Sequence, residues 1–227
     1  GARKGRGLVI AVRLLRRWLT STPPRLLAQF MWAAMRSARS VRAWRRAVAQ
    51  GRPAAPPFLF VSVTDDCNLS CLGCWVTPSR PPRAIEPAVL GRMMGEWIAD
   101  GGAPIIGVLG GEPLLYPALC EVIGRHPEAY VQVFTNGWLL DDATAARFRC
   151  LGNVTPLVSM EGAGETADER RGARGVADRA WTAVDTARRH GLITGVATSL
   201  CQTNLREMTS DAFLAELVRR GVHYVWY

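Results

Sequence analysis

Three cysteines, Cys67, Cys71 and Cys74, lie within eight residues at the spacing C-x3-C-x2-C. Thiolate sulfur is a preferred ligand of zinc, copper(I) and iron–sulfur clusters, and an odd number of thiols cannot close into local disulfides. A structural zinc site normally adds a fourth Cys or His and presents its ligands as two spaced pairs, but no second pair follows here. A cubane cluster held by three cysteines leaves one iron open to a small molecule. The spacing favours a cluster over zinc, with metal-free packing of the cysteines as a third interpretation.

The segments around this motif alternate between strand and helix patterns from residue 58 onward. We predict strands over 58–63, 104–109, 130–134, 154–158 and 192–197, with a sixth strand at Val222. We predict helices over 85–100, 118–124, 141–150, 176–190 and 205–220. Such alternation implies βαβ units, a parallel sheet and right-handed crossovers that place the helices outside. The expected fold class is therefore α/β.

Distinctive residues follow the predicted strands at the edge that the carboxyl ends of the strands share, which we call the rim. The segment Gly110-Gly111-Glu112-Pro113 follows the second strand. Its glycines would let the backbone approach a ligand closely, and its carboxylate could accept hydrogen bonds from an ammonium group. Further polar residues follow the third, fourth and fifth strands: Asn136, Ser159, Arg171 and Thr198. Ordinary surface turns are the alternative reading of the Gly-Gly-Glu-Pro and Arg-Arg-Gly segments.

The cysteine motif, on a loop after a predicted strand, resembles the signature of the radical S-adenosylmethionine (SAM) enzymes. The resemblance implies a [4Fe-4S] cluster on Cys67, Cys71 and Cys74, with the amino and carboxylate groups of SAM on the fourth iron. It also implies an open, partial (β/α)6 TIM-like barrel with parallel strands. The stretch of about 170 residues after residue 57 suits that fold, whereas a full eightfold barrel needs roughly 250 residues. The chain would then end within the sixth strand, as a fragment of a longer protein.

The same resemblance assigns cofactor contacts to residues of the rim. By this likeness Gly110, Gly111 and Glu112 hold the amino group of SAM. Ser159 contacts its ribose or carboxylate, and Arg171 neutralises the carboxylate.

Other positions follow the family pattern less closely. Asn136 and Thr198 occupy rim positions that approach the cofactor in the family. Gly73 stands where an aromatic residue usually precedes the third cysteine, and Glu161 stands where Asp is more frequent. Trp75, which directly follows the third cysteine, is the residue we expect near the adenine instead.

The activity implied by the resemblance starts with one electron from a donor such as flavodoxin or ferredoxin. Cleavage of the C5′–S bond of SAM would form a 5′-deoxyadenosyl radical, which takes a hydrogen atom from a substrate that the sequence does not identify, because fold does not fix function. A non-enzymatic module with a structural zinc or iron–sulfur site is the alternative. No Ser-His-Asp pattern or H-E-x-x-H motif supports a hydrolase. We expect the remaining candidates to serve packing: His126, His190, His223 and Cys201.

The basic charge of the chain belongs to one segment. Residues 1–52 hold thirteen Lys and Arg and no Asp or Glu, which gives this segment a charge of +13. The rest of the chain carries −4, and the overall net charge is +9. We predict a basic helical arm and linker over 1–57 and the barrel over 58–227. The six cysteines lack the spacing of a secreted disulfide framework, so a reducing cytoplasm is the expected location.

The arm has a helical pattern over 25–50, with apolar residues on one face and Arg39, Arg42 and Arg46 on another. Its earlier apolar run, 8–12, is too short to span a bilayer, and a signal peptide is not indicated. The arm could lie on an anionic membrane surface, which would make the protein peripheral or bring it a lipid substrate. It could instead cap the catalytic domain. A nucleic-acid partner is not expected, because no recognisable binding fold accompanies the arginines.

Overall fold

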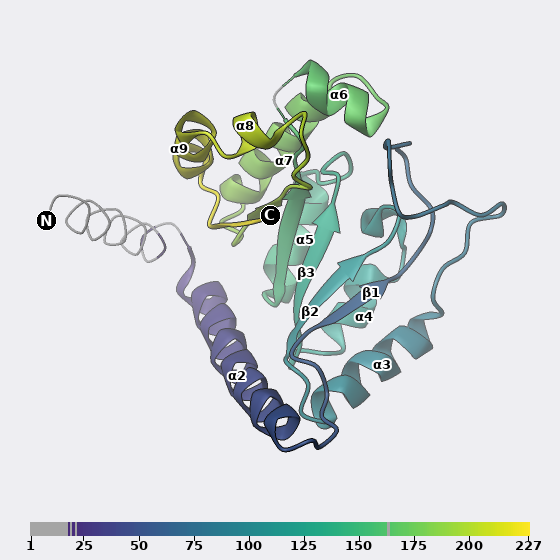
Figure 1. Ribbon diagram of the computed structural model, residues 1–227, viewed down its shortest axis with the longest axis vertical. Coiled ribbons are helices and arrows are strands. Elements are labelled where there is room, and N and C mark those ends of the chain that lie inside the picture. The colour runs from purple at the N-terminus through teal and green to yellow at the C-terminus, as the bar shows by residue number, and fades with distance from the viewer. Residues whose placement is uncertain (1–17, 19, 21, 163) are drawn as a thin grey trace, which may run out of the picture.

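The computed structural model describes residues 18, 20, 22–162 and 164–227. Six strands form one parallel sheet in the order of the sequence, which confirms the predicted α/β fold (Figure 1). The strands are β1 (Leu59–Ser62), β2 (Ile105–Leu109), β3 (Tyr130–Thr135), β4 (Val154–Ser159), β5 (Gly195–Ala197) and β6 (Tyr224–Trp226). Strands β1 and β6 are the two edges of this sheet, so the barrel that it forms is open.

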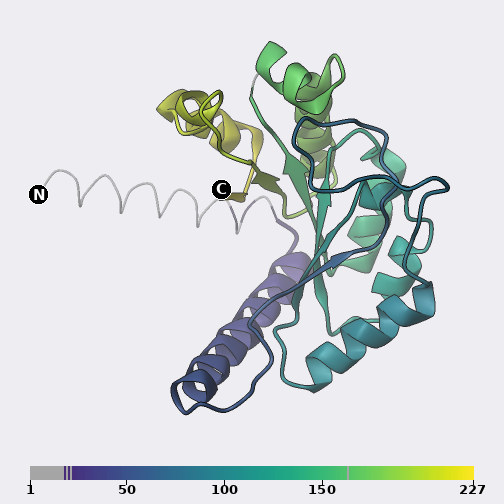
Figure 2. The ribbon, with the colours of Figure 1, turned by 45° about the vertical axis from the view of Figure 1, so that its right-hand side comes forward.

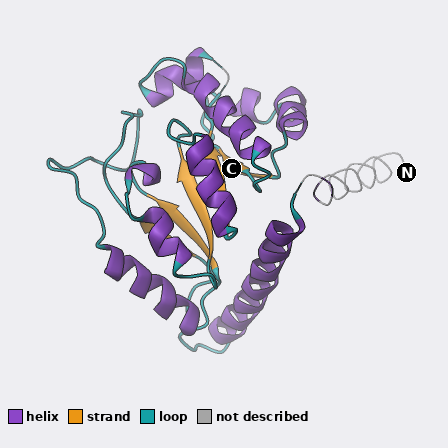
Figure 3. Ribbon diagram, turned by 180° about the vertical axis from the view of Figure 1, so that it is seen from behind, coloured by secondary structure: helices purple, strands orange, loops and turns teal. Residues whose placement is uncertain are grey.

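Helices connect successive strands and cover the outer face of the sheet, as the view from behind shows (Figure 3). The longer ones are α3 (Pro87–Ala99), α5 (Asp142–Leu151), α7 (Val176–Arg189) and α9 (Asp211–Arg220). The shorter ones are η1 (Pro113–Leu115), α4 (Leu119–Gly124), α6 (Glu165–Arg171) and α8 (Leu205–Met208). Helix α3 starts at a proline, which suits the first helical turn, whereas α5 and α9 end at glycines in the left-handed conformation.

Local capping explains where the elements differ from the sequence pattern. The helix predicted over 205–220 is divided into α8 and α9, because Ser210 has an extended backbone and its hydroxyl accepts a hydrogen bond from Phe213 N at 3.1 Å. The fifth strand begins at Gly195, since Leu192 N still donates to Ala187 O in the last turn of α7. The Arg-Arg-Gly segment belongs to α6, which Gly172 ends with a φ of 67°.

The hydrophobic core lies between the outer face of the sheet and the helices that cover it. Strand residues such as Ile106, Val108 and Val131 are fully buried there with Met94 of α3 and Phe148 of α5. Each large apolar side chain contributes roughly 1.5–3 kcal/mol when it leaves water. This core holds the strand ends in fixed positions and therefore fixes the rim.

Helix α2 (Pro24–Ala49) lies across the amino-terminal ends of the strands, opposite the rim (Figures 1 and 2). Its Phe30 packs edge-to-face on Tyr130 at the start of β3, with ring centroids 5.5 Å apart. Its Ser40 hydroxyl donates to the carbonyl of Gly102, just before β2. The helix thus packs on the barrel, as one of the two interpretations of the arm expected.

Trp18 adds a ring contact with His223, which precedes β6. Except for this residue, the apolar stretch of the arm before residue 19 lies outside the described residues. Within the part of the chain that is described, no helix is both long enough and apolar enough to cross a membrane. The domain boundary between residues 57 and 58 stays a prediction.

Candidate active site

The three cysteines lie on the segment between β1 and α3, residues 64–84, which we call the Cys loop. A bridge between Thr64 and Ala84 closes its base. Above the bridge, the Asp65 carboxylate accepts hydrogen bonds from Ser79 and from Arg83 N, at 2.7 Å for the latter. The bond from the Ser79 side chain, with the other donors, lowers the pKa of Asp65. Asp65 therefore fixes the base of the loop as a carboxylate.

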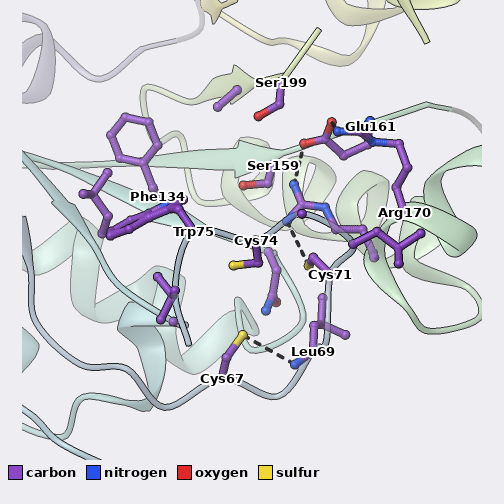
Figure 4. Close-up of a pocket in the computed structure, with 18 of the residues that line it drawn as sticks. Cys67, Leu69, Cys71, Cys74, Trp75, Phe134, Ser159, Glu161, Arg170 and Ser199 are labelled. Carbon is purple, nitrogen blue, oxygen red and sulfur yellow. Dashed lines mark hydrogen bonds and ion pairs between the residues drawn. The ribbon is translucent and has the colours of Figure 1, made fainter. Parts of the chain in front are cut away.

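All three thiols line one cavity of about 680 Å³ at the rim (Figure 4). Cys67 and Cys71 are partly buried, and Cys74 is exposed. Burial raises the pKa of the Cys67 thiol, and Leu69 N donates to its sulfur at 3.4 Å. The thiols form no disulfide. Among the described residues, no group of three or more His, Cys, Asp or Glu side chains is arranged to hold a single metal ion.

The two glycines after β2 bring that loop into backbone contact with the Cys loop. Gly111 N donates to Thr64 O and Glu112 N donates to Asp66 O, both at 2.7 Å. A Cβ atom on Gly110 would overlap the Thr64 carbonyl, and one on Gly111 would overlap that of Asp66. Both glycines line the cavity. Glycine is therefore required here for contact between two loops, in addition to any contact with a ligand.

Glu112 is directed into the protein and does not line the cavity. Its side chain is fully buried, and its carboxylate accepts from Leu114 N, from the Thr135 hydroxyl at 2.7 Å and from Asn136 N at 2.8 Å. Burial raises the pKa of Glu112, while these bonds act in the opposite direction. The carboxylate thus joins the loop after β2 to the end of β3. Its expected contact with an amino group of SAM stays a prediction.

Asn136 extends this connection to the Cys loop. Its Nδ2 donates to Asn68 Oδ1 at 2.8 Å, and its Oδ1 accepts from Trp138 N at 2.9 Å. Asn136 lines the cavity, although both ends of its amide already have partners, and its expected approach to the cofactor stays a prediction. Asn68 was not predicted as a site residue. Its position directly after the first cysteine is the only signal that could have singled it out.

Arg171 lies beside the cysteines in a charged cluster. Its Nη2 is 2.9 Å from Glu161 Oε1, and its Nη1 donates to Cys71 Sγ at 3.8 Å. Arg170 pairs with the other oxygen of Glu161 at 3.2 Å. Glu161 is buried and lines the same cavity. Two guanidinium groups share one carboxylate, so the cluster keeps one positive charge at the rim.

Helix α6 also supports the Cys loop through its backbone. Leu72 N donates to Arg170 O at 2.8 Å, and a Cβ atom on Gly172 would overlap the carbonyl of Ser70. The Arg-Arg-Gly segment is therefore in contact with the cysteine motif, which the surface-turn interpretation did not anticipate.

Ser159, Thr198 and Trp75 complete the predicted set, and each lines the cavity. Thr198 is 5% exposed, and its hydroxyl has no hydrogen-bond partner among the described residues. A buried hydroxyl of this kind normally has a partner, so it suits a polar ligand in the cavity. Trp75 lines the cavity and is 70% exposed. The individual roles assigned to these residues stay predictions.

An aromatic layer that the sequence did not reveal lies inside the barrel. The rings of Phe60, Phe134 and Trp226 stand edge-to-face, with centroids 5.8–5.9 Å apart. They connect β1, β3 and β6 across the open barrel. Gly107 makes room for them, because a Cβ atom there would overlap the Phe60 ring. A glycine within a predicted strand was the available signal, since it often marks a close approach.

Comparison with known proteins decides the family. A family model described as the radical SAM superfamily matches residues 61–215. The chain belongs to this superfamily. Radical SAM proteins use a [4Fe-4S] cluster and SAM, as the cysteine motif predicted.

Two curated relatives show how this radical SAM chain compares in length. It is 29% identical over 178 residues to the AdoMet-dependent heme synthase of Methanosarcina barkeri, covering 76% of this chain and 51% of that protein. It is 27% identical over 163 residues to Fe-coproporphyrin III synthase of the same organism, covering 70% of this chain and 41% of that protein. The chain thus spans about half of the length of the first relative and about two fifths of the second.

The fold of this radical SAM chain is also found in solved structures. SuiB of Streptococcus suis bound to S-adenosylmethionine superposes with a TM-score of 0.62 at 19% identity, covering 78% of this chain and 40% of that one. SuiB bound to the precursor peptide SuiA gives a TM-score of 0.63 at 18% identity, covering 78% of this chain and 40% of that one. This likeness establishes the partial barrel.

The residues of the cavity fit both radical SAM cofactors. Cys67, Cys71 and Cys74 supply three thiolates, the ligands that iron–sulfur clusters require. Arg171 supplies a positive charge for a carboxylate. Thr198 supplies a buried hydroxyl that has no protein partner in the part that is described. When bound, the cluster and SAM would supply the one-electron chemistry, which the surrounding protein positions and shields.

Proposed function

We propose that this chain binds a [4Fe-4S] cluster and SAM at the rim and cleaves SAM reductively, to form a 5′-deoxyadenosyl radical that takes hydrogen from a substrate. The observation that carries the proposal is one cavity, lined by three thiols, a pair of glycines and Arg171. In this proposal the electron comes from a one-electron donor such as flavodoxin or ferredoxin.

The protein would contribute position, charge and exclusion of water. The Cys loop holds the thiols against the loop after β2, and Arg171 would bind the carboxylate of SAM while still paired with Glu161. Phe134 and Trp226 line the cavity from inside the barrel. Their rings would keep water away from a reactive carbon-centred radical. The hydroxyls of Ser159 and Thr198 remain to orient polar groups of SAM.

The test is anaerobic reconstitution of the chain with iron and sulfide, followed by addition of reductant and SAM. We expect 5′-deoxyadenosine to form, and we expect Cys71→Ala to abolish it. Cys150→Ala is the matched control, because Cys150 is an exposed thiol that does not line the cavity. No product from the wild-type chain, or an equal yield from Cys71→Ala, would contradict the proposal.

Metal analysis separates this proposal from a structural zinc site. The proposed enzyme requires iron with acid-labile sulfide, whereas a zinc site would hold one zinc ion and no sulfide. Zinc bound at one equivalent, together with failure to incorporate iron and sulfide, would favour the non-enzymatic alternative.

The arrangement of α2 does not favour a lipid substrate. This helix lies at the amino-terminal ends of the strands (Figure 2). The cavity is lined by residues at their carboxyl-terminal ends. A membrane in contact with α2 would therefore face the side of the barrel opposite the proposed reaction.

A further inference from the structure

We propose that the outer face of α2 binds the surface of an anionic lipid bilayer and leaves the rim directed toward water. This face is the side of the helix turned away from the barrel. The charged side chains of this face are all positive, because α2 contains six arginines and no Asp or Glu. The six are Arg25, Arg36, Arg39, Arg42, Arg45 and Arg46.

No arginine of α2 forms an ion pair with a carboxylate of the described residues, although Arg36 is close enough to Glu128 to interact with it electrostatically. None of them forms an ion pair or a hydrogen bond through its side chain within the described part of the chain. By contrast, several arginines on other helices are paired, such as Arg189 with Asp142 and Arg220 with Asp185. The residues that precede α2 contain no Asp or Glu either. The unneutralised charge on this face is complementary to an anionic surface.

Apolar side chains lie among these charges. Met31, Trp32 and Met35 are 49%, 40% and 55% exposed. At 100° per residue, Met31, Met35, Arg39, Arg42 and Arg46 all fall within one quadrant of the helix. The Arg36 guanidinium lies 4.8 Å from the centre of the Trp32 ring.

This combination distinguishes a bilayer from a nucleic acid. Phosphate groups on a nucleic acid would account for the arginines, but they offer no apolar layer to exposed methionines. A helix in the membrane interface buries its apolar side chains below the headgroups while its arginines contact lipid phosphates. Trp is also frequent at that depth. The face of α2 therefore fits an anionic bilayer better than it fits DNA or RNA.

The opposite side of α2 is already occupied, which fixes the orientation of the protein. Leu26 and Ala33 are buried, and Phe30 packs on Tyr130. The helix can therefore bind a bilayer without leaving the barrel. The strands then lead away from the lipid, so the cavity opens toward water.

Vesicle flotation of the full chain tests this proposal. We would use vesicles of phosphatidylcholine alone and of phosphatidylcholine with phosphatidylglycerol. Near an anionic surface each arginine changes the partition coefficient by about fivefold. We expect Arg39→Glu with Arg42→Glu to lower the partition coefficient by at least about 25-fold. The control is Arg92→Glu with Arg188→Glu, which produces the same change in net charge. These arginines of α3 and α7 are exposed and form no ion pair with another described residue.

A second pair of variants tests the apolar contribution. Met31→Ser with Met35→Ser should weaken binding to the anionic vesicles. The loss should persist at about 1 M salt, where charges are screened within about 3 Å and the apolar contribution remains. Met93→Ser, an exposed methionine of α3, should have no effect.

Three outcomes would overturn the proposal. The first is equal binding to neutral and anionic vesicles. The second is an equal loss of binding in the α2 and control charge variants. The third is a chain that retards labelled duplex DNA or single-stranded RNA in a gel-shift assay but does not float with the vesicles. That result would assign the face to nucleic acid.

Discussion

Replacement of Glu112 by glutamine tests whether this carboxylate holds the rim together before any cofactor binds. Its two oxygens accept three hydrogen bonds inside the protein, from Leu114 N, the Thr135 hydroxyl and Asn136 N. Glutamine keeps the shape but replaces one accepting oxygen by an NH2 group that faces a donor. A hydrogen bond to a charged group contributes roughly 1.5–3 kcal/mol, and an unsatisfied buried donor costs roughly 1–3 kcal/mol. We expect Glu112→Gln to lower the free energy of unfolding of the cofactor-free chain by about 2–4 kcal/mol.

The assay is urea unfolding of the cofactor-free chain, followed by circular dichroism. Glu121→Gln is the matched control, because this glutamate of α4 is exposed and forms an exposed ion pair with Arg125, four residues later. Exposed pairs of this kind contribute about 0–1 kcal/mol. The two variants lose the same charge and keep the same shape, so the difference between them measures the buried hydrogen bonds.

The pH dependence gives a second signature. Burial raises the pKa of Glu112 above 4.5, so the folded chain binds this proton more tightly than the unfolded chain does. The part of the stability that comes from protonation of this group is therefore present at low pH. It is lost as pH rises from about 4.5 through the raised pKa of the folded state. That component should be missing in Glu112→Gln.

One result would refute this reasoning. If cofactor-free Glu112→Gln unfolds within about 0.5 kcal/mol of the wild type, the size typical of neutral surface substitutions, the internal hydrogen bonds do not stabilise the rim. Weaker SAM binding in the same variant would then assign the carboxylate to the cofactor.

Three further outcomes follow from contacts at the rim and in the barrel. Gly111→Ala should destabilise the cofactor-free chain by about 1–3 kcal/mol in urea unfolding, since its Cβ atom would overlap a backbone carbonyl of the Cys loop. A double-mutant cycle with Phe60→Leu and Trp226→Leu should give a coupling of about 0.5–1.5 kcal/mol, and no coupling would remove the ring contact across the open barrel. In the cofactor-free chain iodoacetamide should modify Cys201 before Cys120 at pH 8, as read by mass spectrometry. The hydrogen bond from Thr203 lowers the pKa of Cys201, whereas burial raises that of Cys120.

Much of the fold followed from the sequence because its strands are short apolar runs that end at glycines or polar residues. The order of elements and the parallel sheet were predicted correctly. The details that the sequence did not predict depend on single side chains. The break between α8 and α9 rests on the hydroxyl of Ser210, and the late start of β5 rests on a backbone bond that extends the end of α7. Hydrophobic periodicity does not report such local competition.

The site was predictable at the level of loops and less so at the level of atoms. Parallel strands bring the loops at their carboxyl ends together, so the cysteines, Ser159 and Thr198 could be placed on one cavity. The direction of the Glu112 side chain could not be predicted, because it depends on the Thr135 hydroxyl and on Asn136 N twenty-three and twenty-four residues away. The aromatic layer was missed for the same reason, since Phe60 and Trp226 meet only after the barrel has formed.

These contacts also show how the cysteine motif is supported from one end to the other. At its start, the loop after β2 and Asn136 contact the backbone of Asp66 and the side chain of Asn68, and Cys67 is partly buried. Toward its end, Leu72 is 72% exposed and keeps one backbone hydrogen bond to α6, while Cys74 is exposed. The protein therefore positions the first thiol before any cofactor arrives. The last thiol is the most exposed of the three, so a cluster bound across all three would add most to the support of that end of the loop.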